Sequence, residues 1–167
     1  MDKNNFIIKQ QIESNVSSIR NLLNTGVFSA PVLHPFCEPV FVSVILKLHD
    51  LLQKFSQLSS RIAFTDDVAD GDITDLVSKI RNAICHLDSP ENLLDKQSQL
   101  KFVFNMIAGK GTAIDLGGKP LAASQYEDDI AFYYGEHRLY FKRHLIRVIS
   151  ESMGVFRKLY PNERALF

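Results

Sequence analysis

The stretch DITDLVSKIRNAICHL, residues 72–87, decides how the rest of the chain is interpreted. Its apolar residues recur at spacings of three and four, which predicts an amphipathic helix with one buried face. They are Ile73, Leu76, Val77, Ile80, Ala83, Ile84 and Leu87. Asp72 and Asp75 stand at the start, where carboxylates cap the free backbone N–H groups and complement the helix dipole. We therefore expect a helix over residues 72–87.

The end of this helix carries three polar side chains, Arg81, Asn82 and His86. Asn82 and His86 are four residues apart and share one helix face, and Arg81 flanks that face. Arginine binds phosphate through paired N–H groups, histidine titrates near neutral pH, and a neighbouring amide can orient the imidazole. The three residues are candidates for proton transfer on a phosphodiester. A structural role stays open, in which His86 caps the helix C-terminus and Arg81 pairs with a carboxylate.

The order of these residues, an arginine, a polar residue, three further residues and a histidine, resembles the Arg-x(4–6)-His motif of the HEPN superfamily. The resemblance covers about residues 72–90. It implies a mainly α-helical bundle and a metal-independent endoribonuclease that serves as a toxin or antiphage-defence effector. It further implies a homodimer whose motifs face each other across the two-fold axis, and an antitoxin as a possible partner.

The chemistry of such a ribonuclease follows from the residue types. His86 accepts the proton of the ribose 2′-hydroxyl, Arg81 stabilises charge on the phosphate oxygens, and Asn82 orients the histidine or the phosphate. The products are a 2′,3′-cyclic phosphate and a 5′-hydroxyl, and neither a metal nor another cofactor is expected. One chain offers one motif histidine, so the second acid is expected from the partner of a two-fold dimer.

A second candidate site is the basic stretch 136–147, with Arg138, Lys142, Arg143 and Arg147 interleaved with aromatic residues. Such charges can follow an RNA backbone while aromatic rings stack on bases. The alternative is a solvated surface that balances the acidic segment 66–75. His144, within the same stretch, fits a packed histidine equally well.

The remaining helices are predicted over residues 2–24, 39–60 and 142–160 from the same periodicity. Ser89 and Pro90 are typical of a helix start, so a further helix is expected to begin there. Between it and the last helix, short aromatic segments bounded by glycines favour strands. The expected fold is mainly α, a HEPN-like helical bundle with a small β-hairpin insert at about 101–141. A helix over 95–108 is the competing interpretation.

Length and composition limit the function classes. The chain of 167 residues suits a single domain over 1–167, and 46% hydrophobic with 23% charged residues is typical of a globular protein. Lys+Arg and Asp+Glu are 19 each, so no overall positive charge attracts nucleic acid. The longest apolar run is too short to cross a bilayer, and the first residues do not resemble a signal peptide. We expect a cytoplasmic protein that does not bind membranes.

Two other functions stay open. One is a non-catalytic HEPN-like module that binds a nucleotide or a protein. The other is a helical dimerisation or antitoxin-type protein in which Arg81 and His86 have a structural role only.

Overall fold

The computed structural model describes residues 3–29, 34–86, 88–95, 100–101 and 104–161. Its backbone contacts divide the chain into two compact units. Unit 1 consists of Met1–Ala63 and Val148–Phe167, and unit 2 of Phe64–Arg147. The single domain predicted over 1–167 stays a prediction, because contacts within the chain do not test whether either unit folds alone.

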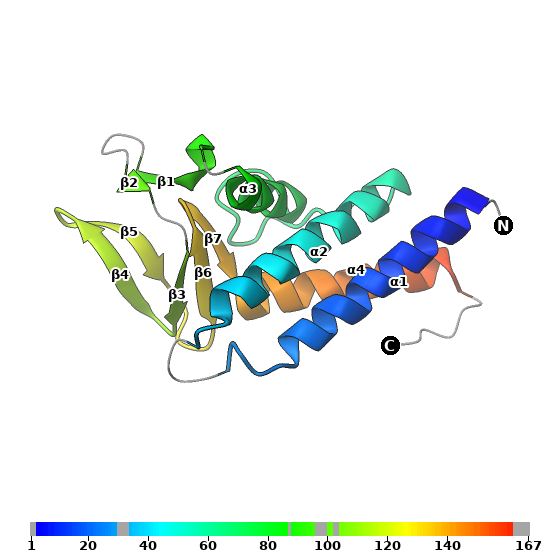
Figure 1. The fold of residues 1–167 in the computed structure, drawn as a ribbon, viewed down its shortest axis with the longest axis horizontal. Helices are drawn as coiled ribbons and strands as arrows, with labels where there is room; N and C mark the ends of the chain where they lie inside the picture. Colours follow the sequence, from blue (N-terminus) through cyan, green and yellow to red (C-terminus); the bar gives the residue numbers. More distant parts are fainter. Residues whose placement is uncertain (1–2, 30–33, 87, 96–99, 102–103, 162–167) are drawn as a thin grey trace. The chain divides into compact units, whose positions relative to one another are not determined.

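Unit 1 contains the long helices of the chain, α1 (Lys3–Leu23) and α2 (Cys37–Gln57), and nearly all of α4 (Arg147–Leu159). α1 and α2 run side by side (Figure 1). Their buried residues recur every three or four positions, which confirms the helices expected there. Fully or nearly buried in α1 and α2 are Ile12, Val16, Ile19, Phe41, Val44, Ile45, Leu48, Leu51, Leu52 and Phe55.

Unit 2 begins with α3 (Ile73–Cys85), the helix of the opening sequence stretch. Its cap is the predicted one: the Asp72 carboxylate accepts hydrogen bonds from the Thr74 N–H at 2.8 Å and the Asp75 N–H at 3.0 Å. The Asp75 carboxylate accepts the Asp72 N–H in return, at 3.2 Å. α3 ends at Cys85, and Leu87, which was expected in the helix, lies outside the described residues.

The rest of unit 2 is mostly strand. A single turn of 3-10 helix, η1 (Pro90–Asn92), leads into seven strands in three antiparallel sheets among the described residues. β1 (Leu93–Asp95) pairs with β2 (Leu100–Lys101), and β4 (Gly111–Leu116) pairs with β5 (Lys119–Ser124). The third sheet has β6 (Ile130–Tyr134) between β3 (Asn105–Ala108) and β7 (His137–Tyr140). A π-helical segment, η2 (Phe141–Ile146), connects β7 to α4.

The predicted fold class, a HEPN-like helical bundle with a small β insert at 101–141, is therefore wrong. About 51% of the structure is helix and 21% is strand, and the strands begin at Leu93. Ser89 caps as expected, since its Oγ accepts the Glu91 N–H at 3.2 Å, but the helix it starts has one turn only. The next residues pair with β2 instead of continuing that helix. The competing helix over 95–108 is also wrong, because β3 pairs with β6 there.

The core of the strand region is aromatic. Ala122, Ala131, Tyr133 and Tyr140 form a buried cluster, against which half-buried hydrophobic residues pack. The Tyr133 hydroxyl bonds both backbone groups of Ala123, donating to the oxygen at 2.7 Å and accepting from the N–H at 3.0 Å. A buried tyrosine whose hydroxyl is satisfied in this way adds apolar area without an unpaired polar atom.

Within the described residues, no helix combines the length and the apolar character that crossing a bilayer requires.

Candidate functional site

Two of the three predicted catalytic residues, Asn82 and His86, line one open pocket of unit 2, which we call the motif pocket. Its volume is about 760 Å³, and its lining residues are Asn82, Cys85, His86, Asp88, Ser89 and Glu91. They come from the last turn of α3, the bend that follows it and η1. α3 ends before His86, whose backbone is extended, and Ser89 with Pro90 after it begins η1, so the two helical segments are separate.

His86 is held by its backbone, and its side chain is exposed. It follows the last helical residue with extended angles, φ −129° and ψ 95°. Its carbonyl accepts the side-chain N–H of buried Asn92 at 2.8 Å and the Ser89 N–H at 2.9 Å. The backbone bonds fix the Cα position while the imidazole faces solvent, so it can meet a ligand.

Arg81 reaches the motif pocket only through its neighbour. Its Nη1 donates to Asn82 Oδ1 at 3.2 Å, and its side chain is not among those that line the pocket. The structure thus brings Asn82 and His86 to one pocket and Arg81 to its edge.

A second pocket of unit 2, of about 410 Å³, contains both charge signs. Lys79 of α3 donates to the Asp70 carboxylate, which lowers the pKa of Asp70 and raises that of Lys79. Glu136, from the turn between β6 and β7, and His137, the first residue of β7, also line it. His137 Nε2 pairs with Glu91 of the motif pocket, so the two pockets meet at this contact.

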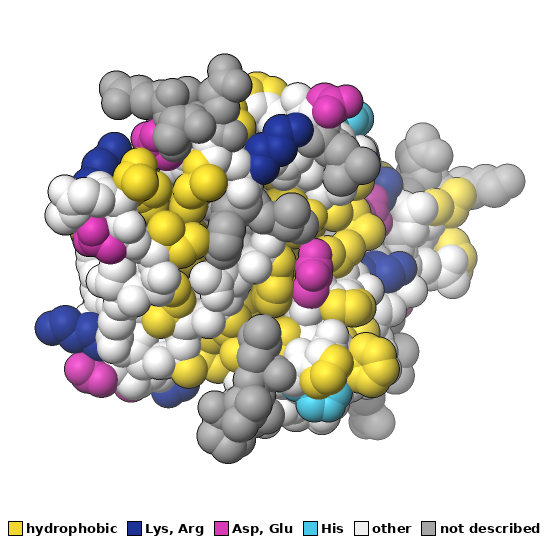
Figure 2. Space-filling model, turned by 60° about the vertical axis from the view of Figure 1, so that its left-hand side comes forward, with side chains coloured by type: hydrophobic (Ala, Val, Ile, Leu, Met, Phe, Trp, Pro, Cys, Tyr) yellow, Lys and Arg dark blue, Asp and Glu magenta, His cyan; other side chains and the backbone are white. Residues whose placement is uncertain are grey.

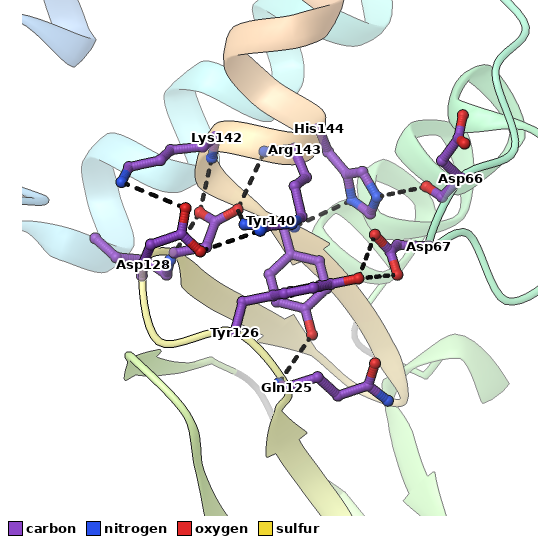
Figure 3. A network of polar contacts seen from close by, with 11 residues as sticks. Asp66, Asp67, Gln125, Tyr126, Asp128, Tyr140, Lys142, Arg143 and His144 are labelled. Atoms are coloured by element: carbon purple, nitrogen blue, oxygen red, sulfur yellow. Dashed lines mark hydrogen bonds and ion pairs between the residues drawn. The ribbon is translucent and has the colours of Figure 1, made fainter.

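Two of the predicted RNA-binding residues, Arg143 and Arg147, belong to a different group, which we call the charged network (Asp66, Asp128, Asp129, Arg143 and Arg147). Figure 3 shows Asp66, Asp128 and Arg143 of this network with their neighbours. Arg143 bonds Asp129 at 2.9 Å and Asp128 at 3.0 Å, and Arg147 bonds Asp66 at 2.8 Å. These bonds lower the pKa of Asp66 and of Asp128, because a neighbouring guanidinium favours the ionised carboxylate.

Asp129 is the buried centre of the charged network, with a side chain that is 0% exposed. Its carboxylate accepts the backbone N–H groups of Ile130 and Lys142, both at 2.8 Å, and of Arg143 at 3.1 Å. Together with the Arg143 guanidinium, four donors satisfy this one side chain. The bonds to Lys142 and Arg143 hold the start of η2 against the loop before β6.

Aromatic rings extend the charged network. The Arg143 guanidinium carbon lies 3.5 Å from the centroid of the Tyr126 ring, a cation–π contact. The Tyr126 hydroxyl donates to both Asp67 oxygens, at 2.8 and 2.9 Å, and this bond raises the pKa of Tyr126 (Figure 3). The guanidinium is therefore enclosed by an aromatic face and two carboxylates.

His144 is fully buried beside the charged network, as the packed alternative expects. Its Nδ1 accepts the Tyr140 N–H at 3.1 Å, so the ring proton is on Nε2, which donates to the Asp66 carbonyl at 3.0 Å (Figure 3). Burial lowers the pKa of His144 from its ordinary value of 6.5. The neutral ring satisfies both neighbours, and a second ring proton would displace the Tyr140 bond.

The remaining basic residues of the stretch differ in accessibility. The Arg138 guanidinium lies 4.9 Å from the Tyr140 ring centroid and its Nη1 donates to the Ala123 carbonyl at 3.3 Å. Lys142 is exposed, and its Nζ lies 4.0 Å from Asp128. On the face drawn in Figure 2, basic and acidic side chains are scattered among hydrophobic ones. The excess positive charge seen in residues 136–147 is largely balanced by aspartates, and one of these, Asp66, comes from the acidic segment 66–75.

Glu91, Glu136 and His137 form a group that was not expected from the sequence: one ligand atom of each lies within 4.8 Å of the others. Glu91 and His137 are 46 positions apart, and their contact depends on how the β6–β7 turn packs on η1. Motif searches that depend on short sequence spacings cannot detect such a pair. The only local signal was the glycine before Glu136, which is typical of a tight turn.

No family model, curated protein or solved structure matches the chain. The HEPN resemblance therefore depends on the motif residues alone, and it stays a prediction.

Proposed function

We propose that this chain is a metal-independent endoribonuclease that acts in the cytoplasm as a homodimer. The observation that carries the proposal is that Asn82 and His86 line one open pocket, with the Arg81 guanidinium bonded to the Asn82 amide at 3.2 Å. The proposal uses the motif residues and their pocket, and it does not need a helical bundle. From the resemblance we add a role as a toxin or antiphage-defence effector, with an antitoxin as candidate partner.

In the proposed reaction, the His86 imidazole removes the proton of a ribose 2′-hydroxyl. The 2′-oxygen forms a bond to the adjacent phosphorus, and the bond from phosphorus to the 5′-oxygen breaks. Arg81 stabilises the negative charge on the non-bridging oxygens, and Asn82 orients the phosphate or the imidazole. The 5′-oxygen leaves with a proton from the His86 imidazolium of the second chain in the dimer, so the products are a 2′,3′-cyclic phosphate and a 5′-hydroxyl.

The first test is cleavage of total bacterial RNA in EDTA, analysed on denaturing gels with identification of the product ends. Wild type is expected to cut and leave 2′,3′-cyclic phosphates, and His86→Ala and Arg81→Ala are expected to lose about 10²-fold or more. Arg20→Ala and His34→Ala, which alter the same residue types in unit 1, serve as controls and should cut normally. Cleavage by His86→Ala at the wild-type rate would refute the proposal. Intact RNA with wild type would also count against it and favour a nucleotide-binding module.

The dimer part of the proposal has its own test, in which wild type and His86→Ala are co-expressed in equal amounts. If each reaction needs one His86 from each chain, only the wild-type pairs, roughly a quarter of randomly formed dimers, remain active. If each chain acts alone, half of the activity remains. Loss in direct proportion to the wild-type fraction would exclude the shared site while leaving the ribonuclease itself intact.

RNA binding by Arg138, Lys142, Arg143 and Arg147 stays part of the proposal in a limited form. A phosphate has to compete with aspartates that lie 2.8–3.0 Å from Arg143 and Arg147, whereas Lys142 is exposed and its ion pair with Asp128 is longer, at 4.0 Å. We therefore expect Lys142→Ala to weaken RNA binding and to lower its salt dependence by about one unit of slope. Filter binding over a range of salt concentrations measures this.

A further inference from the structure

We infer that Glu91, Glu136 and His137 form a binding site for a divalent transition-metal ion. One ligand atom from each residue lies within 4.8 Å of the other two, so rotation of the side chains toward one another would bring all three to one ion. The inference goes beyond the proposed ribonuclease reaction, which needs no metal and gives none of these three residues a role.

The donor set indicates the kind of ion. One imidazole nitrogen with two carboxylate oxygens suits Zn²⁺, Mn²⁺ or Fe²⁺, whereas Mg²⁺ and Ca²⁺ favour sites of oxygen ligands only. Two carboxylates with a neutral imidazole carry two negative charges, which a divalent ion cancels. Three protein ligands leave at least one coordination position for water or for another ligand.

The histidine of the cluster is nearly enclosed by protein. The His137 side chain is 10% exposed and that of Glu91 is 34% exposed, and the two are in direct contact. Glu136 is exposed, which leaves one side of the cluster open for an ion to enter. The imidazole nitrogen of His137 already faces the Glu91 carboxylate, so these two donors are placed side by side before an ion binds.

The backbone of the fold holds the cluster together, and this observation is independent of the charges. Gly135, with φ +59°, forms the β6–β7 turn directly before Glu136 and His137. A Cβ atom at Gly135 would lie 2.0 Å from the Glu91 carbonyl oxygen, so only glycine allows the turn to pack directly on the backbone of Glu91. On the other side, the N–H of Glu91 is held by the capping hydroxyl of Ser89. The ligands are thus fixed by packed backbone and do not depend on flexible side chains alone.

The site opens toward both pockets of unit 2. Glu91 lines the motif pocket, and Glu136 and His137 line the pocket that also contains Lys79 and Arg138. An ion bound here would therefore link Glu91 of one pocket to Glu136 and His137 of the other.

Zinc binding to the whole 167-residue chain tests the site, by isothermal titration calorimetry after chelator treatment and gel filtration. Wild type is expected to bind one Zn²⁺ per chain. Glu136→Gln, which replaces the exposed carboxylate of the cluster by an amide, should weaken the binding at least tenfold, and His137→Gln should do the same. Glu127→Gln, at an exposed glutamate in the loop before β6, is the matched control and should bind as wild type does.

The outcomes that would overturn the inference are distinct. No saturable binding by wild type, or binding by Glu136→Gln as tight as that of wild type, would exclude the site. Loss of binding in Cys85→Ser, with Glu136→Gln unaffected, would place the ion on the exposed thiol of the motif pocket instead. Thermal unfolding with and without Zn²⁺ gives a second measurement, since only a protein that binds the ion is stabilised by it. RNA cleavage in EDTA is measured separately, so either proposal can fail without the other.

Discussion

The motif pocket and the charged network lie in the same unit and use polar residues in opposite ways. In the charged network the ionised groups pair with one another, and Asp129 alone accepts four hydrogen bonds. In the motif pocket the described bonds to His86 involve its backbone, and the imidazole is exposed. The first arrangement stabilises the fold, and the second leaves a titratable group available to a ligand.

This difference shows why the number of basic residues is a poor guide to a binding surface. Residues 138–147 are rich in arginine, but Arg143 and Arg147 are held by aspartates. Residues 81–86 have one arginine and one histidine, with side chains that are half-buried or exposed. Paired charges seldom have free capacity for a ligand, and unpaired polar side chains around a pocket do.

The largest expected effect is on stability, at the centre of the charged network. Asp129→Ala leaves three backbone N–H groups and Nη1 of Arg143 without their acceptor, and it should lower the free energy of unfolding by about 3 kcal/mol. Urea denaturation followed by circular dichroism measures this loss. Asp128→Ala is the matched control, since it removes an exposed partner of the same Arg143 and should have a much smaller effect. Equal losses in both variants would contradict the central role of Asp129.

The next effect depends on pH and concerns His144. Because burial lowers its folded-state pKa below the ordinary 6.5, the unfolded chain takes up the proton first as the pH falls. The stability contributed by the neutral ring is therefore present above about pH 6.5 and is lost as the pH falls below it. Asp66, Asp70 and Asp128 have pKa values that are lowered by basic partners, so the stability that they contribute is present above about pH 3.8 and is lost only as the pH falls below it.

Urea denaturation between pH 8 and pH 5 separates these contributions. Wild type should lose stability over this range, and His144→Gln, although less stable at pH 8, should show a flatter dependence. If both proteins show the same slope, another histidine is responsible.

A smaller loss is expected at the edge of the charged network. Arg147→Met removes the bond to Asp66 and the contact with the Phe64 ring, whose centroid lies 4.0 Å from the guanidinium. Cation–π contacts at exposed positions contribute about 0.5–1 kcal/mol, and a decrease in the melting temperature of a few degrees would reflect this. Added salt should reduce the difference between the two proteins, because the ion pair is partly exposed.

The smallest stability effect is expected in the motif pocket. His86→Ala should change the free energy of unfolding by no more than about 0.5 kcal/mol, because the bonds at this position involve the backbone, which the substitution retains. The same denaturation experiment measures it. A loss comparable to that of Asp129→Ala would show that His86 stabilises the fold, as the alternative of a purely structural motif requires.

The helices could be predicted because their signals are local. The apolar spacing of α1, α2 and α3 and the Asp72 cap all lie within the segment that folds. The extent of the sheets was underestimated for the opposite reason. A strand is stabilised by hydrogen bonds to a neighbouring strand, which can be far away in the sequence. Met106 pairs with Phe132, 26 positions away, and the short apolar run around Met106 fits helix and strand equally well.

The candidate sites follow the same rule. Asn82 and His86 could be placed together from sequence because one helical turn separates them. The bond between Arg147 and Asp66 spans 81 positions and that between His137 and Glu91 spans 46, so no spacing pattern could reveal either. Where such residues meet is decided by the packing of turns such as that at Gly135.

The contacts of Arg147 also determine how the chain enters and leaves unit 2. Arg147 is the last residue of that unit, and it touches Phe64 and Asp66 at the beginning, so the two ends of the 64–147 segment lie together. Unit 1 is completed by residues from both sides of this segment. During synthesis the ribosome has to translate all of unit 2 before α4 is available to the helices made first. Chain ends that lie close together also tolerate circular permutation. We therefore expect that residues 64 and 147 could be joined and new ends made in a loop of unit 2, with the contacts of Arg147 to Phe64 and Asp66 retained.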